Sequence, residues 1–141
     1  MTIDEKKKKL RKYLITVSRL KTKCDDAARW ENLSYGRSGM IISNKSNHHT
    51  DTVKDTAIQL RQECENLAVK ARELRQEMNT AFAEVDDDRL RILLECKYFD
   101  GMSDKELSQK NNYSERHMRR LVTQAINKLD KCSRFFSKSC P

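Results

Sequence analysis

The side chains with the most suggestive chemistry lie in the segment SDKELSQKNNYSERHMRRL, residues 103–121. Three arginines, Arg116, Arg119 and Arg120, follow closely after Ser114. An arginine guanidinium donates two parallel hydrogen bonds to a guanine edge or to a phosphate, so arginines gathered on one helix favour binding to nucleic acid. The segment therefore predicts recognition of DNA rather than covalent catalysis.

A helical wheel drawn at 100° per residue separates the stretch after Ser114 into an apolar side and a basic side. Basic side chains near the N-terminal half of this helix are then expected to point outward together. The expected buried side consists of Met118, Leu121, Val122, Ala125 and Leu129, and the opposite side of Arg116, Arg120, Thr123 and Asn127, flanked by His117, Arg119 and Gln124.

Two roles are expected for the polar residues of this segment. Some should reach base edges or adjacent phosphates, and others should hold the DNA backbone, aided by the positive end of the capped helix. The candidate DNA-binding residues are Arg116, His117, Arg119 and Arg120 for the first role, and Lys105, Lys110 and Ser114 for the second, with Gln124 beside them.

Capping signals define the helices that must position these residues. Ser103 and Glu106 form an S-x-x-E capping box at the start of a short helix, which ends at Asn111-Asn112. Ser114 caps the last helix, which is expected to run to about Lys131. A short helix, a tight turn and a second helix that presents its first turns are the layout of a helix-turn-helix.

One more helix is expected directly before this pair. Three acidic residues, Asp86 to Asp88, suit a helix N-terminus, and Gly101 is expected to act as the C-cap. Its apolar face consists of Leu90, Leu93, Leu94 and Tyr98. The expected DNA-binding domain is therefore residues 86–132, followed by a tail, 133–141, in which Phe135-Phe136 pack back onto the core.

The first part of the chain is expected to form two long helices. Residues 51–85 keep a heptad register, and residues 4–33 keep a poorer one that consists of Leu10, Leu14, Val17, Lys21, Cys24 and Ala28, with Ile3, Tyr13, Leu20, Ala27 and Trp30 thickening its apolar side. A loop at 34–50 would join them into an antiparallel coiled-coil hairpin, residues 1–85, although a parallel homodimer would also pair the stripes. Met40 to Ile42 have no assigned role. The long register consists of Val53, Ala57, Leu60, Cys64, Leu67, Ala71, Leu74, Met78, Ala81 and Val85.

Composition and charge agree with an all-α protein that binds a polyanion. The 141 residues include only 3 glycines and 1 proline, and the formal charge is +8. Both ends of the chain are basic, whereas residues 24–88 are acidic overall. The first residues do not resemble a signal peptide and no apolar run is long enough to span a membrane, so we expect a cytoplasmic protein.

Enzymatic and metal-dependent functions lack the necessary residues. The five cysteines contain no C-x-x-C pair, and His48-His49 are interpreted as part of a solvated loop. No glycine-rich phosphate loop or nucleophile elbow is present. We therefore expect no enzyme activity, no cofactor, no metal and no small-molecule substrate.

The segment RLRILLECKYFDGMSDKELSQKNNYSERHMRRLVTQAINKL resembles the region-four helix-turn-helix of sigma factors. It also resembles the small phage-encoded late activators of Gram-positive bacteria of the ArpU and RinA type, above all in NYSERHMRRL. The chain departs from the sigma pattern at Ser108, where alanine is usual, and at Asn111-Asn112, where Leu-Gly is usual. The resemblance covers roughly residues 86–132, and no counterpart of the promoter-melting or core-polymerase-binding regions is visible. Its shared elements are Tyr98, Gly101, Ser103, Glu106-Leu107, Ser114, Met118, Ala125 and Leu129.

The resemblance implies a sequence-specific, DNA-binding transcription regulator, namely a phage-derived activator that acts at promoters of a bacterial host. RNA polymerase is an implied partner, and a homodimer would also be compatible with the pattern. Two alternatives remain open. One is a phage DNA-packaging protein similar to a terminase small subunit, and the other is a polymerase-binding module that does not read DNA.

Overall fold

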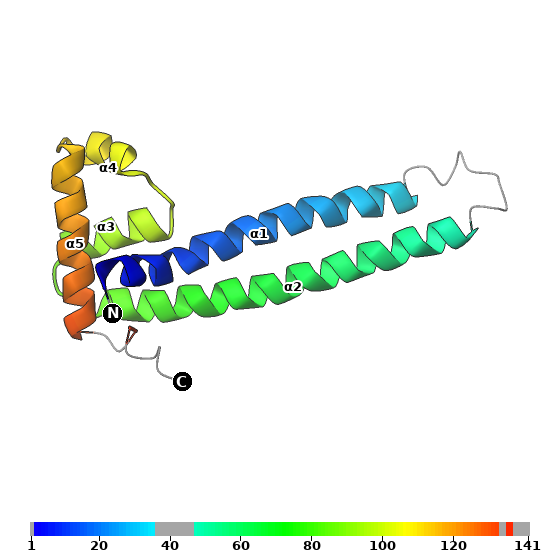
Figure 1. The fold of residues 1–141 in the computed structure, drawn as a ribbon, viewed down its shortest axis with the longest axis horizontal. Helices are drawn as coiled ribbons and strands as arrows, with labels where there is room; N and C mark the ends of the chain where they lie inside the picture. Colours follow the sequence, from blue (N-terminus) through cyan, green and yellow to red (C-terminus); the bar gives the residue numbers. More distant parts are fainter. Residues whose placement is uncertain (1, 36–46, 133–134, 137–141) are drawn as a thin grey trace. The chain divides into compact units, whose positions relative to one another are not determined.

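The computed structural model of the protein describes residues 2–35, 47–132 and 135–136. The described residues form helices and connecting turns without any β-strand, which confirms the predicted all-α class. Figure 1 shows the helices in chain order. They are α1 (Ile3–Tyr35), α2 (Asn47–Ala83), α3 (Asp88–Tyr98), α4 (Asp104–Asn111) and α5 (Glu115–Cys132).

The expected loop at 34–50 is longer than the structure allows. Helix α1 continues to Tyr35 and α2 begins at Asn47, so the backbone of His48 and His49 is helical rather than looped. The predicted ends of these two helices were wrong because serine and asparagine weaken a helix without stopping it. Met40 to Ile42 lie outside the described residues.

Two compact units divide the chain, and the division falls inside the long helices rather than at the expected domain boundary of 85/86. The first unit comprises residues 1–15 and 72–141, and the second comprises residues 16–71. The first unit thus contains the start of α1, the end of α2 and all of α3, α4 and α5.

In the second unit, the α2 register follows the expected heptad pattern. Val53, Ala57, Cys64 and Ala71 are buried, and Leu60 and Leu67 between them are half-buried. Because residues at these spacings share one helical face, α2 presents a continuous apolar stripe. Two ion pairs join α2 to α1 in this unit, between Lys23 Nζ and Glu63 Oε2 at 3.0 Å and between Arg61 and Glu31.

The expected register of α1 is partly wrong. Ala28 is exposed, whereas its neighbour Ala27 is completely buried. Thr16 is also buried, although it lies outside the expected stripe, and Lys21 is exposed to solvent. A stripe interrupted by a lysine leaves two neighbouring faces of similar hydrophobicity, so the packing partner decides which face is buried.

The first unit contains the main hydrophobic core, which α5 packs together with α3 and α4. Phe82 is completely buried near the end of α2 and lies 5.2 Å, between ring centroids, from Phe99. Tyr13 of α1 meets Phe99 edge-on at 5.6 Å. Arg75 covers the Phe99 ring at 4.3 Å and donates a 3.0 Å hydrogen bond to the Tyr13 hydroxyl. This aromatic cluster fixes the helix ends that support α3.

The C-terminal phenylalanines pack onto the core, as predicted. Phe135 and Phe136 are 6% and 5% exposed. Lys9 of α1 lies 4.6 Å above the Phe135 ring and donates a hydrogen bond to the Phe135 carbonyl. Lys6 lies 5.7 Å from the Phe136 centroid and pairs with Asp130 at 2.7 Å. Two of the four lysines at 6–9 therefore contact Phe135 and Phe136.

The predicted start of α3 is confirmed, but its C-cap lies two residues before the predicted Gly101. The Asp87 carboxylate accepts hydrogen bonds from the Arg89 N–H at 3.0 Å and the Leu90 N–H at 3.4 Å. The helix ends at Tyr98 with Phe99 as the C-cap. Gly101 follows with φ +72°, and the Met102 N–H then donates to the Cys96 carbonyl at 3.1 Å.

Replacement of Gly101 by alanine is expected to destabilise the protein by about 1–2 kcal/mol, because only glycine adopts a positive φ without strain. The added methyl would meet Leu14 at 3.8 Å, an ordinary contact, so crowding contributes little. Asn112→Gly is the matched control, because Asn112 also has a positive φ, of 59°, and glycine should be neutral or stabilising there. Urea denaturation measures both; equal stability of Gly101→Ala and the wild type would contradict the strain.

The Tyr98 side chain predicts a specific loss of stability in alkali. Its hydroxyl is buried without a hydrogen-bond partner in the described part of the chain, and burial raises the pKa of Tyr98 to about 12. The unfolded pKa is about 10, so the contribution is fully present below pH 10 and is lost as the pH rises towards 12. Tyr98→Phe should match the wild type at pH 7 and lose less stability between pH 10 and 12. Parallel pH profiles of the two proteins would refute this.

Candidate nucleic-acid interface

Helix α5 starts where the sequence predicts, because Ser114 satisfies its first N–H groups. The Ser114 hydroxyl accepts a hydrogen bond from the His117 N–H at 3.1 Å, and its carbonyl accepts from the Met118 N–H at 3.0 Å. The α5 stripe is buried as the helical wheel predicts, except that Leu121 is only partly buried. Ile126 is completely buried as well, although it lies outside the predicted stripe. Burial on one side fixes which side of α5 remains free.

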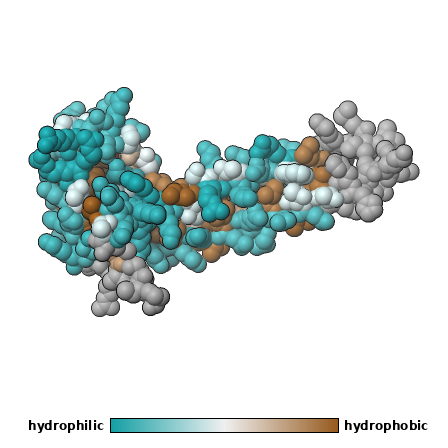
Figure 2. Space-filling view, in the orientation of Figure 1, coloured by the Kyte–Doolittle hydropathy of each residue, from teal (hydrophilic) through white to brown (hydrophobic). Residues whose placement is uncertain are grey.

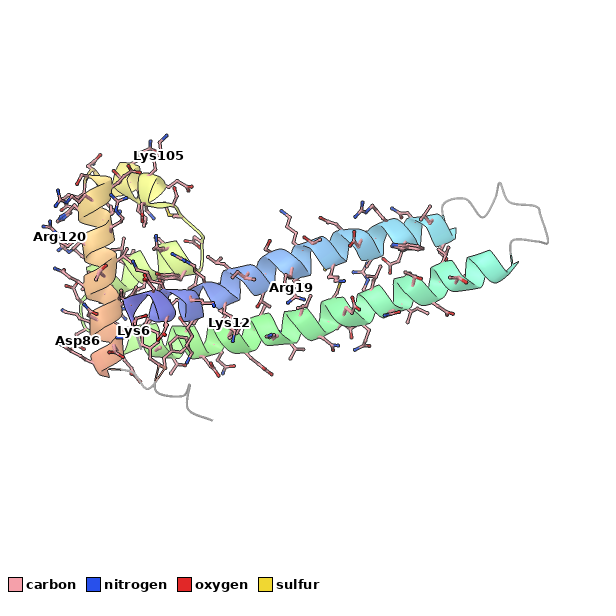
Figure 3. All side chains as sticks on the ribbon, in the orientation of Figure 1. Lys6, Lys12, Arg19, Asp86, Lys105 and Arg120 are labelled. Carbon is pink, nitrogen blue, oxygen red and sulfur yellow. The ribbon has the colours of Figure 1, made fainter. Side chains whose placement is uncertain are left out.

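The free side of α5 is polar and basic. Arg116, Arg119, Arg120, Gln124 and Asn127 are exposed, and Thr123 is half-buried with its hydroxyl bonded to the Arg119 carbonyl at 3.0 Å. Figure 2 shows mainly hydrophilic residues on the visible face of α4 and α5. Figure 3 marks Arg120 on α5 and Lys105 on α4. Sequence reasoning therefore placed the arginines on the correct face.

The turn between α4 and α5 is short and well bonded. Helix α4 begins at the predicted cap, where the Ser103 hydroxyl accepts from the Glu106 N–H at 3.2 Å. Its C-cap is Asn112, which takes the left-handed conformation, φ 59° and ψ 37°, that asparagine tolerates better than most residues. The Tyr113 N–H donates to the Ser108 carbonyl at 3.2 Å, and the Ser108 hydroxyl donates to the Tyr113 carbonyl. The Ser108 hydroxyl thus stabilises the turn through a hydrogen bond, and not only through close packing of the helices.

Two of the arginines are available for an external partner. Neither Arg116 nor Arg120 forms an ion pair with any residue in the described ranges. Each guanidinium therefore keeps its donors facing water, where a phosphate or a guanine edge would be a stronger, charged or bidentate acceptor. Arg116 and Arg120 lie one turn apart, which places both side chains along one line of the helix surface.

Arg119 has an internal partner that sequence reasoning missed. Its Nη1 lies 3.9 Å from Asp104 Oδ2, and the same carboxylate binds the Lys97 ammonium at 2.8 Å. Asp104 is the first residue after the Ser103 cap, a position where acids are common for dipole reasons. The helix dipole alone would explain an acid at this position, so the sequence does not predict its ion pairs. Nothing in the spacing of the residues shows that Lys97 of α3 and Arg119 of α5 approach Asp104.

The remaining candidate residues do not all join the arginines. Lys105 and Gln124 are exposed, and Ser114 is used as the cap of α5. The His117 ring packs against Tyr113 with centroids 4.7 Å apart. The Lys110 ammonium lies 3.4 Å from Cys96 Sγ, so this side chain is directed towards α3. The arginines and Gln124 of α5, with Lys105 of α4, therefore form the exposed part of the candidate interface.

Within the described ranges, no three histidine, cysteine or acidic side chains are grouped as metal ligands. None of the helices found there is sufficiently long and apolar to cross a lipid bilayer.

Comparisons of the chain with protein-family models, with curated proteins and with solved structures found no match.

Proposed function

We propose that this protein is a sequence-specific DNA-binding regulator of transcription, in which α4 and α5 form a helix-turn-helix and α5 enters the major groove. The exposed pair Arg116 and Arg120 is the main support for this proposal. The two arginines have no ion-pair partner in the described residues, and they lie opposite the buried stripe of α5. A recognition helix needs this combination, because one side must be anchored while the other reaches base edges.

The surroundings of α5 support the same role. Ser114 caps its N-terminus, where the helix dipole favours a phosphate. The three residues 112–114 separate α4 from α5, a length typical of the turn in this motif. The exposed Lys105 on α4 adds a charge for the DNA backbone. Asp104 orients Arg119 towards α4 and leaves the bases mainly to Arg116 and Arg120.

We further propose that the regulator resembles sigma region four over residues 86–132 and acts as a phage-derived activator in the cytoplasm of a bacterial host. RNA polymerase is then a natural partner at the promoter. If the protein is a homodimer, its two binding half-sites should lie about one helical turn of DNA apart.

A salt titration tests whether DNA is bound with sequence preference. Full-length protein would be titrated into short duplexes at several salt concentrations, with and without excess random duplex. A regulator should keep a preferred sequence at physiological salt, whereas phosphate attraction alone should weaken steeply with salt and show no preference. The second outcome would favour the polymerase-binding module. A large ring by mass in solution would favour the packaging alternative.

The N-terminal residues 1–85 are proposed to form an antiparallel helical hairpin within one chain. The ion pairs Lys23–Glu63 and Arg61–Glu31 support it. The later residue of α1, Glu31, pairs with the earlier residue of α2, Arg61, as expected for antiparallel helices. Such a hairpin would act as a spacer or dimeriser, or as a docking surface for polymerase.

Oxidation provides a direct prediction for the hairpin. Burial raises the pKa of the Cys64 thiol, and the nearby Cys24 side chain raises that pKa further. Diamide, which takes two electrons and two protons from a thiol pair, should form an intramolecular Cys24–Cys64 disulfide. The reaction should accelerate as the pH rises, because the thiolate is the nucleophile.

Peptide mapping after diamide treatment measures this crosslink, with Cys24→Ser as the control. The hairpin predicts monomers that have lost two hydrogens and contain the Cys24–Cys64 peptide pair. A parallel homodimer predicts Cys24–Cys24 or Cys64–Cys64 pairs in a species of doubled mass, and that result would overturn the hairpin.

A further inference from the structure

A hollow of about 290 Å³ opens between α3, α4 and the start of α5. Its floor is the apolar core, represented by Leu93, Leu107 and Met118, all less than 7% exposed. Its rim carries two large hydrophobic side chains that remain in water, Ile92 at 56% and Tyr113 at 46% exposed. Exposed hydrophobic residues beside an apolar hollow are typical of ligand sites, and this volume is at their small end, about 300 Å³.

Two strong hydrogen-bond donors at the hollow have weak acceptors. The Lys110 ammonium donates to Cys96 Sγ at 3.4 Å, and the Asn111 amide nitrogen lies 3.8 Å from Met118 Sδ. Sulfur accepts hydrogen bonds poorly, so these contacts use little of what an ammonium and an amide can donate. The Asn111 amide spends its other hydrogen on the Leu107 carbonyl at 2.9 Å, which holds the group in place.

The positively charged side chains that line the hollow favour an anionic ligand. Lys110 and Arg89 both line it, whereas none of its described lining residues is acidic. Arg89 forms no ion pair with another described residue. An anionic oxygen would replace sulfur as the acceptor of Lys110 with a shorter, charge-assisted bond.

From these observations we propose that the hollow binds a small carboxylate with an aliphatic or aromatic body. The carboxylate would accept hydrogen bonds from Lys110 and Asn111 in place of the two sulfur contacts. The body would cover Leu93 and Met118 and remove Ile92 from water. Arg89 contributes positive potential at the mouth, which disfavours cationic ligands.

Met118 and Leu121 belong to α5, so an occupied hollow would contact the helix that carries Arg116 and Arg120. Control of DNA binding by the carboxylate follows from this contact and rests on the proposed function. Occupancy of the hollow itself does not rest on the proposed function, and it can be measured without DNA.

The experiment uses full-length protein with octanoate and 4-phenylbutyrate as carboxylate probes and octanol as the neutral control. Calorimetric titration should give saturable binding of a carboxylate at one site, and octanol should bind about tenfold more weakly. Lys110→Met keeps the length of the side chain and removes its charge, and it should weaken carboxylate binding by about tenfold. Lys128→Met removes an exposed lysine of α5 outside the hollow and should leave binding unchanged.

A chemical readout locates the bound probe. Cys96 lines the hollow and Cys24 does not, so alkylation of both thiols can be compared by peptide mass spectrometry. A saturating carboxylate should slow alkylation of Cys96 and leave Cys24 unaffected. The proposal is overturned if neither carboxylate binds saturably, if Lys110→Met binds as tightly as the wild type, or if neither carboxylate slows the alkylation of Cys96. Loss of DNA binding by any of these proteins would bear on the proposed function alone.

Discussion

Replacement of both Arg116 and Arg120 by alanine is expected to abolish sequence-specific DNA binding while leaving the fold intact. Each lost bidentate contact to a base should cost about 1–3 kcal/mol, so the pair should lower affinity by roughly 30-fold to more than ten-thousandfold. Both side chains are exposed and form no ion pair in the described residues, so stability should change little. Fluorescence anisotropy with a preferred duplex and with a scrambled duplex measures the effect.

The same helix supplies a control with an equal change in charge. Lys128 and Lys131 are exposed in the last turns of α5, far along the helix from Arg116. Lys128→Ala/Lys131→Ala removes two positive charges, so it should weaken both duplexes alike and preserve the preference. If the two double variants lose affinity to the same extent, with the preference unchanged, the arginines act only as charges and α5 does not read bases.

Replacement of Phe82 by alanine is expected to destabilise the first unit by about 3–5 kcal/mol, the typical cost of emptying a buried aromatic site. Phe82 is completely buried and packs on Phe99, which in turn contacts Tyr13 and Arg75. The cavity would therefore loosen the contact that ties α2 to the end of α3. Urea denaturation followed by circular dichroism measures the free energy of unfolding.

Ile58→Ala provides the comparison, because Ile58 lies on the same helix but is 68% exposed. Its loss should change stability by less than about 0.5 kcal/mol. Phe82→Leu should lie between the two variants and guards against a Phe82→Ala protein that does not fold. Equal stability of Phe82→Ala and Ile58→Ala would contradict the packing described for the first unit.

Signals local in sequence predicted their structures well. The S-x-x-E box at Ser103, the cap at Ser114 and the Asp87 carboxylate before α3 each bond the backbone within three residues, so no distant part of the chain decides them. The α5 stripe was predicted for a similar reason. Its apolar residues leave only one side of the helix that can be buried, and the arginines necessarily occupy the other.

Contacts between distant segments could not be predicted from the sequence. The Asp104 carboxylate meets both Lys97 and Arg119, and Lys110 meets Cys96, only because α3, α4 and α5 pack together. Neighbouring alanines such as Ala27 and Ala28 have the same hydrophobicity, so the interface alone selects the buried one. Phe82 lies beside the heptad register and is buried by the aromatic cluster instead.

The exposed arginine pair on α5 is the central element of the proposed function, and selection from a random DNA library tests it most directly. Full-length protein would be incubated with random duplexes at near-physiological salt, and the bound DNA would be sequenced after successive rounds. The Arg116→Ala/Arg120→Ala variant would be treated in parallel. The account predicts enrichment of one short motif by the wild-type protein and none by the variant. Recovery of random sequence by both proteins, at levels that fall equally with added salt, would contradict it.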